Sequence, residues 1–118
     1  MALTFQKEGG DVWVLRISGL LRKSEQDAVQ AAAAKEFEAG GTTKLLVIAE
    51  DFRGWEAGAD WGDLTFLLKY GDRITRIAVV ADPKWEDSFL MFAGAGFRRA
   101  PVKFFPEGQT TEARAWLG

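Results

Sequence analysis

The sequence contains no cysteine and no histidine among its 118 residues. Without cysteine the chain has no disulfide framework and no thiolate metal site, which fits a reducing compartment. Without histidine it lacks the side chain on which serine–histidine triads, imidazole metal sites and most proton transfers near neutral pH depend. Ser18, Ser24 and Ser88 stand in no nucleophile-elbow motif. These absences exclude several classes of enzyme, and we expect a protein that is not an enzyme.

Long apolar runs and a strong excess of one charge are also missing. Residues 1–8 lack the basic start and apolar core of a signal peptide, and no run is long enough to cross a membrane. We therefore expect a soluble, cytoplasmic protein. The formal net charge is −2, and we interpret the densest basic group, Arg98 and Arg99 with Lys103, as a solvated helix end. This charge pattern predicts no nucleic-acid partner.

The composition predicts one globular domain over residues 1–118, because 47% of the residues are apolar and 27% are charged, with both signs spread along the chain. The first part of this domain is predicted to be a hairpin. Residues 3–8 and 12–18 are strand-like, and Gly9, Gly10 and Asp11 supply a turn between them. The first strand should therefore pair antiparallel with the second.

A helix is predicted to follow this hairpin. Residues 24–27 have the form of a capping box, in which Ser24 supplies a hydroxyl for the free amides of the first turn. Gly40 and Gly41 supply the end of the helix. Its expected buried face, at helical spacing, comprises Ala28, Val29, Ala32 and Phe37.

The second half of the chain predicts a parallel sheet. Residues 44–49 and 76–81 are short segments that are apolar without a break after their first, basic residue, the pattern of strands that helices cover on both faces. Between them, Asp60 is predicted to cap a helix that ends at Gly71. The residues of this helix that should face the sheet are Trp61, Leu64, Leu67 and Leu68.

The remaining elements complete the predicted fold. A third helix is expected over residues 85–96, a last strand over 102–105 and a final helix over 110–117. The order is ββαβαβαβα. This order predicts an α/β domain with a mostly parallel central sheet, flanked by helices, and an antiparallel edge strand.

That order resembles, over essentially the whole chain, the STAS domains of anti-sigma-factor antagonists and, more closely, their SpoIIAA-like relatives, which are grouped in fold with the CRAL-TRIO lipid-binding domains. Residues 14–20, 46–55 and 76–82 carry the resemblance. It implies a non-catalytic regulatory or protein-interaction module. In the antagonists, a partner kinase phosphorylates a serine in the loop after the third strand, and the added charge breaks the complex. Residues 50–60 contain no serine or threonine, so we do not transfer this switch.

The loops after the two central strands are the predicted binding site, because open α/β sheets bind ligands at the carboxyl ends of their strands. Acidic side chains and large aromatic rings gather in these loops. The residues predicted to bind a ligand or partner are Glu50, Asp51, Phe52, Arg53, Trp55, Trp61, Asp82 and Trp85.

A magnesium site is one interpretation of these acids, since hard cations bind oxygen ligands. The positions of the acids do not match those of a response-regulator receiver, however. Helix capping and solvation are sufficient to explain Asp60, Glu86 and Asp87. We therefore predict neither a metal nor another cofactor.

Two interpretations of the tryptophans remain open. Trp61 has the spacing of a core residue, whereas Trp55 and Trp85 could form the rim or floor of an apolar pocket. The leading functional hypothesis is a protein-interaction module. The alternative is a protein that binds a small apolar or lipid-like ligand at the carboxyl ends of the strands.

The third predicted helix carries four consecutive apolar residues, from Phe89 to Phe92, which must point in nearly every direction around its axis. They cannot all face one sheet. Either a neighbouring helix covers the remainder or a second subunit does, since aromatic residues and methionine are enriched at interfaces. Phe89, Met91 and Phe92 are therefore candidates for the interface of a homodimer.

Overall fold

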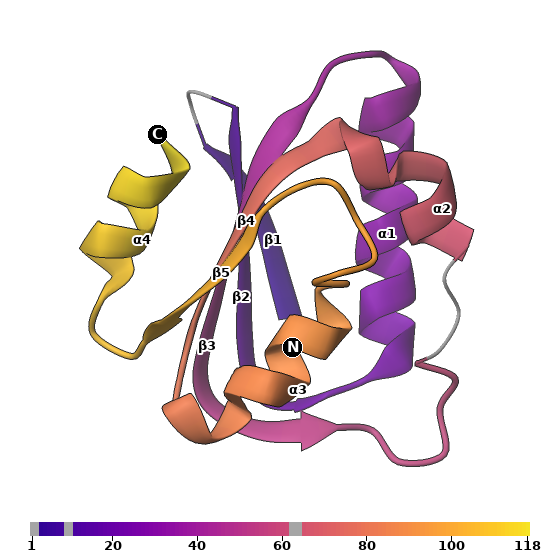
Figure 1. Cartoon of the computed structure of the whole chain (residues 1–118). Helices are drawn as coiled ribbons and strands as arrows, with labels where there is room; N and C mark the ends of the chain where they lie inside the picture. Colours follow the sequence, from indigo (N-terminus) through magenta and orange to yellow (C-terminus); the bar gives the residue numbers. More distant parts are fainter. Residues whose placement is uncertain (1–2, 9–10, 62–64) are drawn as a thin grey trace.

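The computed structural model describes residues 3–8, 11–61 and 65–118, and a five-stranded sheet forms its centre (Figure 1). The strands lie side by side in chain order: β1 (Leu3–Glu8), β2 (Val12–Leu21), β3 (Thr43–Trp55), β4 (Ile74–Ala81) and β5 (Val102–Pro106). β1 pairs antiparallel with β2, and every other neighbouring pair is parallel. The predicted α/β fold, with its antiparallel edge strand, is confirmed.

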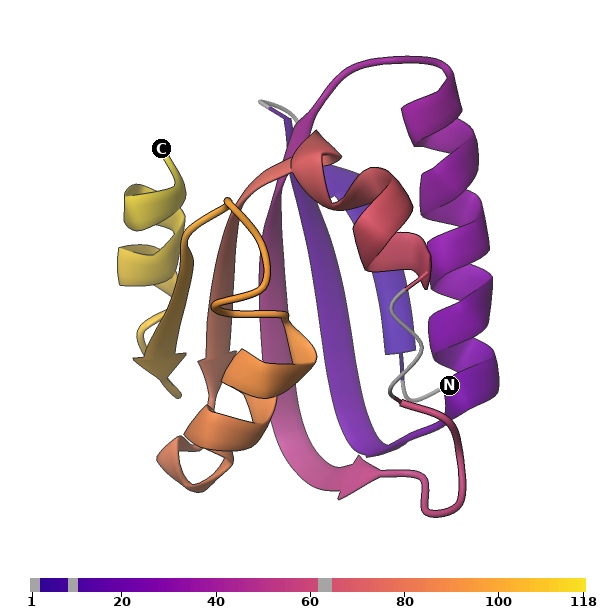
Figure 2. The ribbon, with the colours of Figure 1, turned by 45° about the vertical axis from the view of Figure 1, so that its right-hand side comes forward.

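The helices cover the two faces of the sheet unequally (Figures 1 and 2). One face carries α1 (Lys23–Glu38), α2 (Thr65–Tyr70) and α3 (Glu86–Phe92), and the other carries α4 (Thr110–Leu117). The 3-10 turns η1 (Gly71–Arg73) and η2 (Pro83–Trp85) precede β4 and α3 respectively. In the part of the chain that the structure describes, no helix combines the length and the apolar character needed to span a bilayer.

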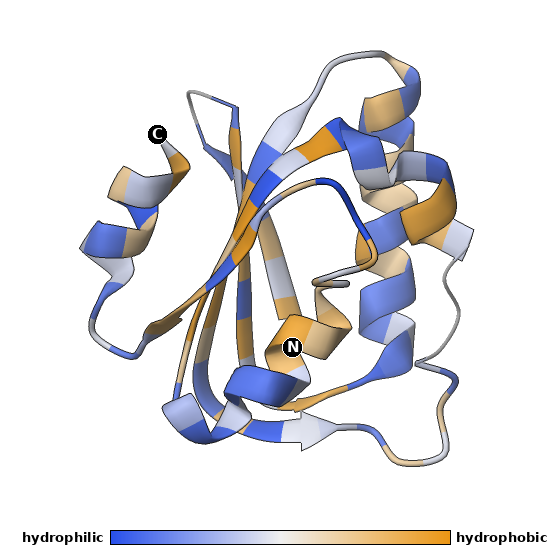
Figure 3. Ribbon diagram, viewed as in Figure 1, coloured by the Kyte–Doolittle hydropathy of each residue, from blue (hydrophilic) through white to orange (hydrophobic). Residues whose placement is uncertain are grey.

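The sheet separates two apolar cores. Val47 and Val79 point toward α1, α2 and α3, whereas Leu46 and Ala78, their neighbours along the strands, point toward α4. This alternation follows from the two-residue repeat of a strand, and it explains why both central strands are apolar throughout. Figure 3 shows the hydrophobic residues concentrated in these strands.

The capping box predicted for α1 is wrong. The helix begins at Lys23, its N-cap is Arg22, and the Arg22 side chain makes no capping hydrogen bond. Ser24 lies inside the first turn and is exposed. The Glu25 carboxylate instead accepts a hydrogen bond from the backbone N–H of Leu3, at 3.0 Å, so it ties the helix to β1.

The buried face of α1 also differs from the prediction. Ala33 and Phe37 are buried, whereas Ala28 and Ala32 are exposed. The ring of Phe37 stacks on Trp13 of β2 with 4.9 Å between centroids and 18° between planes. This contact rotates the helix so that residues 33 and 37, one turn apart, face the sheet.

α2 and α3 are both shorter than predicted. α2 begins at Thr65; Trp61 precedes it, Leu64 lies outside the described residues, and Leu68 is 83% exposed rather than core-facing. Phe66 and Tyr70 face the core in its place, because their rings pack against Phe37.

α3 ends at Phe92, four residues before the predicted end. Gly94 takes a left-handed conformation, with φ +79°, and its N–H bonds the Met91 carbonyl while the Ala95 N–H bonds the Leu90 carbonyl. This pair of bonds is a Schellman motif, which satisfies the last carbonyls of a helix. Glycine at position 94 therefore ends the helix.

Candidate functional site

β3 extends beyond its predicted end, through the segment expected to be a loop. β2 continues past Gly19 to Leu21, and β3 continues beside it to Trp55. The late pairs are Gly19 with Phe52, Leu20 with Gly54, and Leu21 with Trp55. The binding residues predicted between positions 50 and 55 therefore lie on a paired strand, which holds their backbone in place.

Two bulges distort this extension. Ser18 pairs with Glu50 and Gly19 with Phe52, so Asp51 is an extra residue on β3, and Arg53 is a second one before Gly54. Bulges bend a strand and redirect its side chains. Figures 1 and 2 show β3 curving sharply at this end, and Asp51 and Arg53 are exposed there.

Asp51 lies in the left-handed region with φ +51°, where glycine is favoured over residues with a side chain. The strain predicts that Asp51→Gly raises the free energy of unfolding by up to about 1 kcal/mol, although it removes an exposed charge. Asp51→Val should instead lower it by about 1–2 kcal/mol, because a β-branched residue is disfavoured there. Urea unfolding of both variants measures the difference. Equal effects would show that this conformation is not maintained in solution.

Six aromatic residues meet on the α3 side of the sheet at this end, and we call them the ring cluster. They are Phe52, Trp55, Trp61, Trp85, Phe89 and Phe92. Phe52 lies 4.8 Å from Trp55, 5.0 Å from Trp85 and 4.9 Å from Phe89, measured between ring centroids. These are contact distances for offset and edge-to-face rings, so the rings fill the space between them.

The three tryptophans of the ring cluster have different polar contacts. The indole N–H of Trp61 donates to the Glu56 carbonyl at 2.9 Å. The indole nitrogen of Trp55 is buried and has no hydrogen-bond partner among the described residues. Trp85 is half-buried, and its ring lies 6.0 Å from that of Trp55. Trp55 and Trp85, the predicted pair, are therefore brought together, but in contact with each other and with core rings.

The charged residues of this edge divide into two groups. Asp82 accepts the backbone N–H of Lys84 at 2.9 Å, and so caps η2. Glu56 accepts the backbone N–H of Lys23 at 3.1 Å. These two acids thus have structural roles.

Glu50, Asp51 and Arg53 form the second group, which we call the charged rim. All three are exposed, and within the described ranges their side chains make no hydrogen bond or ion pair. No set of three acidic side chains in the described part of the chain is placed to hold a metal ion. The charged rim stands on a bulged strand. Phe52, between Asp51 and Arg53, is buried and packs in the ring cluster.

The predicted dimer residues lie in different environments. Phe89 is 0% exposed and Phe92 is half-buried, and both belong to the ring cluster. Their i, i+3 spacing on one face of α3 is the signal that could have placed them there. Met91 is 78% exposed. Phe97, five residues after the end of α3, is 77% exposed, and the sequence did not indicate that Phe97 would be a surface residue. The homodimer stays a prediction, and of its three predicted residues Met91 is the exposed one.

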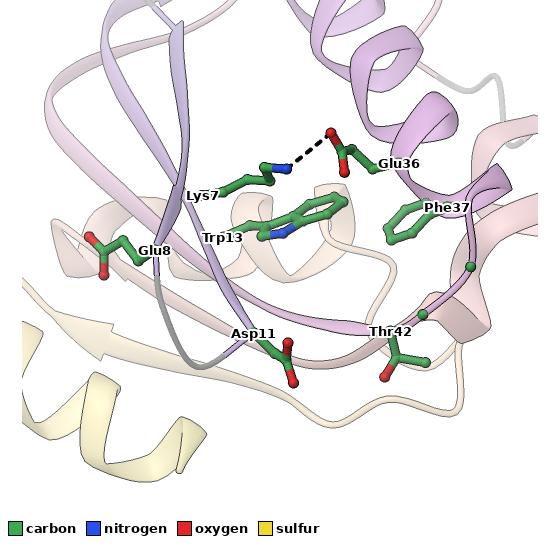
Figure 4. Close-up of a pocket in the computed structure, with 9 residues that line it drawn as sticks. Lys7, Glu8, Asp11, Trp13, Glu36, Phe37 and Thr42 are labelled. Atoms are coloured by element: carbon green, nitrogen blue, oxygen red, sulfur yellow. Dashed lines mark ion pairs between the residues drawn. The ribbon is translucent and has the colours of Figure 1, made fainter.

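A hollow of about 420 Å³ lies at the opposite end of the sheet, beside the start of β2 and β3 (Figure 4). Its lining comprises Lys7, Glu8, Asp11, Trp13, Glu36, Phe37, Gly40, Gly41 and Thr42. Lys7 pairs with Glu36 at 3.0 Å, and the hydrogen bond from Arg114 holds the pKa of Glu8 below its ordinary value. Because these charges are satisfied within the molecule, the charged rim is the stronger candidate for a binding site.

Comparison with known proteins agrees with this architecture. The model of the SpoIIAA-like family matches residues 12–118. An uncharacterised protein of the DUF3478 family with a SpoIIAA-like fold, from Shewanella loihica PV-4, is 21% identical; the alignment covers 99% of this chain and 93% of that one, with a TM-score of 0.73. The anti-sigma factor antagonist SpoIIAA in its unphosphorylated form is 13% identical over 98% of each chain, with a TM-score of 0.63.

The two solved structures establish the fold alone at these identities. The sequence matches no curated protein. The family match, by contrast, extends from β2 to the last residue of α4 and beyond it to the end of the chain. The chain therefore belongs to the SpoIIAA-like family.

Proposed function

We propose that this domain is a non-catalytic regulatory or protein-interaction module, and that it binds its partner through the charged rim of Glu50, Asp51 and Arg53. Family membership supports a regulatory role, because one structural relative is an anti-sigma factor antagonist. The observation that carries the proposal is the position of the charged rim. Three exposed, unpaired charges stand on the bulged strand that also carries Phe52 and Trp55 of the ring cluster.

Rigidity is the physical reason why such a surface suits a protein partner. Phe52 is buried between Asp51 and Arg53, so its ring contacts hold the backbone that carries both charges. A surface that is ordered before binding loses less conformational entropy on association. Charged groups at such a surface mainly set the specificity and rate of association.

The second candidate function is the binding of a small apolar or lipid-like ligand at the same edge. The buried, unpartnered indole N–H of Trp55 favours it, since a ligand could supply an acceptor there. The contacts of Phe52 with Trp55 and Trp85 count against it, because a ligand would have to displace a ring. We therefore place it second.

The phosphorylation switch of the antagonists is not part of this proposal. No serine or threonine occurs from Glu50 to Trp61, so neither the charged rim nor the turn after it offers a hydroxyl for a kinase. Binding would have to be regulated in another way.

The test compares two double variants that each preserve net charge. Glu50→Lys with Arg53→Glu reverses two of the three charges of the rim, and Lys103→Glu with Glu107→Lys reverses the charges of two residues of β5 and the following turn. Tagged proteins are used to capture partners from the source cells, with capture quantified by mass spectrometry. We expect a protein that wild type and the β5 variant retain and the rim variant loses by about tenfold or more. Equal capture by both variants, with unchanged thermal unfolding, would overturn the proposal.

A further inference from the structure

Arg98 is not the solvated helix-end residue that the sequence predicted. It lies six residues beyond the end of α3, in the segment that leads to β5, and it is half-buried. Its side chain folds back on Gly94: a Cβ atom added at Gly94 would lie 3.2 Å from Arg98 Nε and 3.3 Å from Leu67 Cδ2. Glycine at position 94 therefore leaves the room that the guanidinium occupies.

The basic group that contains Arg98 is also divided by the fold. Lys103 lies over the ring of Phe105, 5.2 Å from its centroid, and Phe105 belongs to the core under α4. Gly94 and Leu67 flank Arg98. Gly94 follows α3 and Leu67 lies in α2, and both helices cover the opposite face of the sheet. Lys103 is thus no neighbour of Arg98.

The guanidinium of Arg98 has donors without acceptors. Nε and Nη1 are both buried, and neither has a hydrogen-bond partner among the described residues. Burial lowers the pKa of Arg98 from its ordinary value, yet a guanidinium stays protonated in proteins. Folded proteins pair nearly all buried polar groups, and a buried charge without a partner is strongly destabilising.

We propose that Arg98 is the anchor of an oxyanion-binding site, which accepts a carboxylate or phosphate group in the segment between α3 and β5. The planar guanidinium offers parallel N–H donors that match the spacing of two oxygens in either group. Gly96, with φ +85°, has no atom within 4 Å of an added Cβ, so the backbone two residues before Arg98 is open at that position. This site is separate from the charged rim and does not depend on the proposed function.

The direct test is NMR of the Arg98 Nε–Hε group during titration with inorganic phosphate and, separately, with acetate. Sodium chloride keeps the ionic strength constant. We expect a saturable shift with at least one of the two anions, and the stronger response identifies the class of oxyanion. At roughly ten times the dissociation constant, the anion should raise the melting temperature by about 4–8 °C.

Arg98→Met and Arg99→Met are the matched variants. Arg99 is the exposed neighbour, so Arg99→Met should keep the anion effect on melting temperature, and Arg98→Met should lose it. Should Arg98→Met not fold, Arg98→Lys serves, because it keeps the charge and loses the paired donors; we expect about tenfold weaker binding or more. An anion effect that survives both Arg98 substitutions, or that sodium chloride reproduces, would overturn the proposal.

A carboxylate from within the chain is the main competing explanation. Asp63 lies outside the described residues, and Asp63→Asn tests it directly. We expect this variant to leave the Arg98 Nε–Hε resonance unchanged in the absence of added anion. A large shift of that resonance would mean that Asp63 is the partner, and it would overturn the external site.

Discussion

Replacing Phe89 by alanine is expected to lower the free energy of unfolding by about 3–5 kcal/mol. Phe89 is 0% exposed, and its ring contacts Phe52 and Trp55 at 4.9 Å and 5.1 Å between centroids. Its removal would leave a cavity between α3 and the rings of Phe52 and Trp55 on β3, and these rings could refill it only in part. Thermal unfolding should show a fall in melting temperature of more than about 10 °C.

Met91→Ala is the control for that substitution. Met91 lies two residues further along the same helix and is 78% exposed, so its truncation should change stability by no more than about 0.5 kcal/mol. The two variants alter the same helix with similar changes in propensity. Similar losses from both would mean that α3 packs through a different face from the one seen in the structure.

Trp55→Ala is expected to cost about 2–4 kcal/mol, somewhat less than a fully buried tryptophan because Trp55 is half-buried. The indole ring contacts four other members of the ring cluster: Phe52, Trp85, Phe89 and Phe92. As the floor of a pocket, Trp55 could be truncated with little loss of stability. A large loss in urea unfolding supports the core interpretation over the pocket.

Trp55→Phe separates the ring from its N–H group. The phenyl ring keeps part of the packing and removes a buried donor that has no acceptor among the described residues, so we expect a loss of no more than about 1 kcal/mol. The comparison of Trp55→Phe with Trp55→Ala measures how much of the contribution is packing. If the phenylalanine variant is as unstable as the alanine variant, the indole N–H has an acceptor in solution.

The central architecture could be predicted because its signals are local. The unbroken apolar runs at 45–49 and 77–81 have no polar face to expose, so both must be buried strands of a parallel sheet. The turn residues between 8 and 12 likewise restrict the first two strands to a hairpin, and β1 and β2 do pair antiparallel. Predictions from such local patterns need little information about tertiary contacts.

The shape of the candidate site depended on contacts that no local pattern contains. Residues 50–55 combine acids with Gly54, which is typical of a loop, but β2 extends to Leu21 and supplies backbone partners for β3 as far as Trp55. The gathering of acidic and aromatic residues at this edge was predictable from topology. The mutual packing of the rings was not, because it depends on how α3 lies against β3.

The choice of which helix face is buried also depended on tertiary contacts. α1 carries alanines on several sides, so its buried face is decided by the stacking of Phe37 on Trp13. The position of Arg98 depends on the glycine that ends α3 two residues after Phe92 and on Leu67 of α2. Such contacts join residues far apart in the sequence, and periodicity alone does not reveal them.

Native mass spectrometry of freshly purified protein tests the central claim most directly. The claim is that the rings of the ring cluster contact one another and leave no pocket, so that the carboxyl ends of the strands bind a partner through their surface. We predict the mass of the polypeptide chain, or a whole multiple of it, with no small molecule retained. A retained apolar molecule that is present in wild type and absent from Trp55→Phe would contradict the account, because it would place a ligand where the structure has rings in contact.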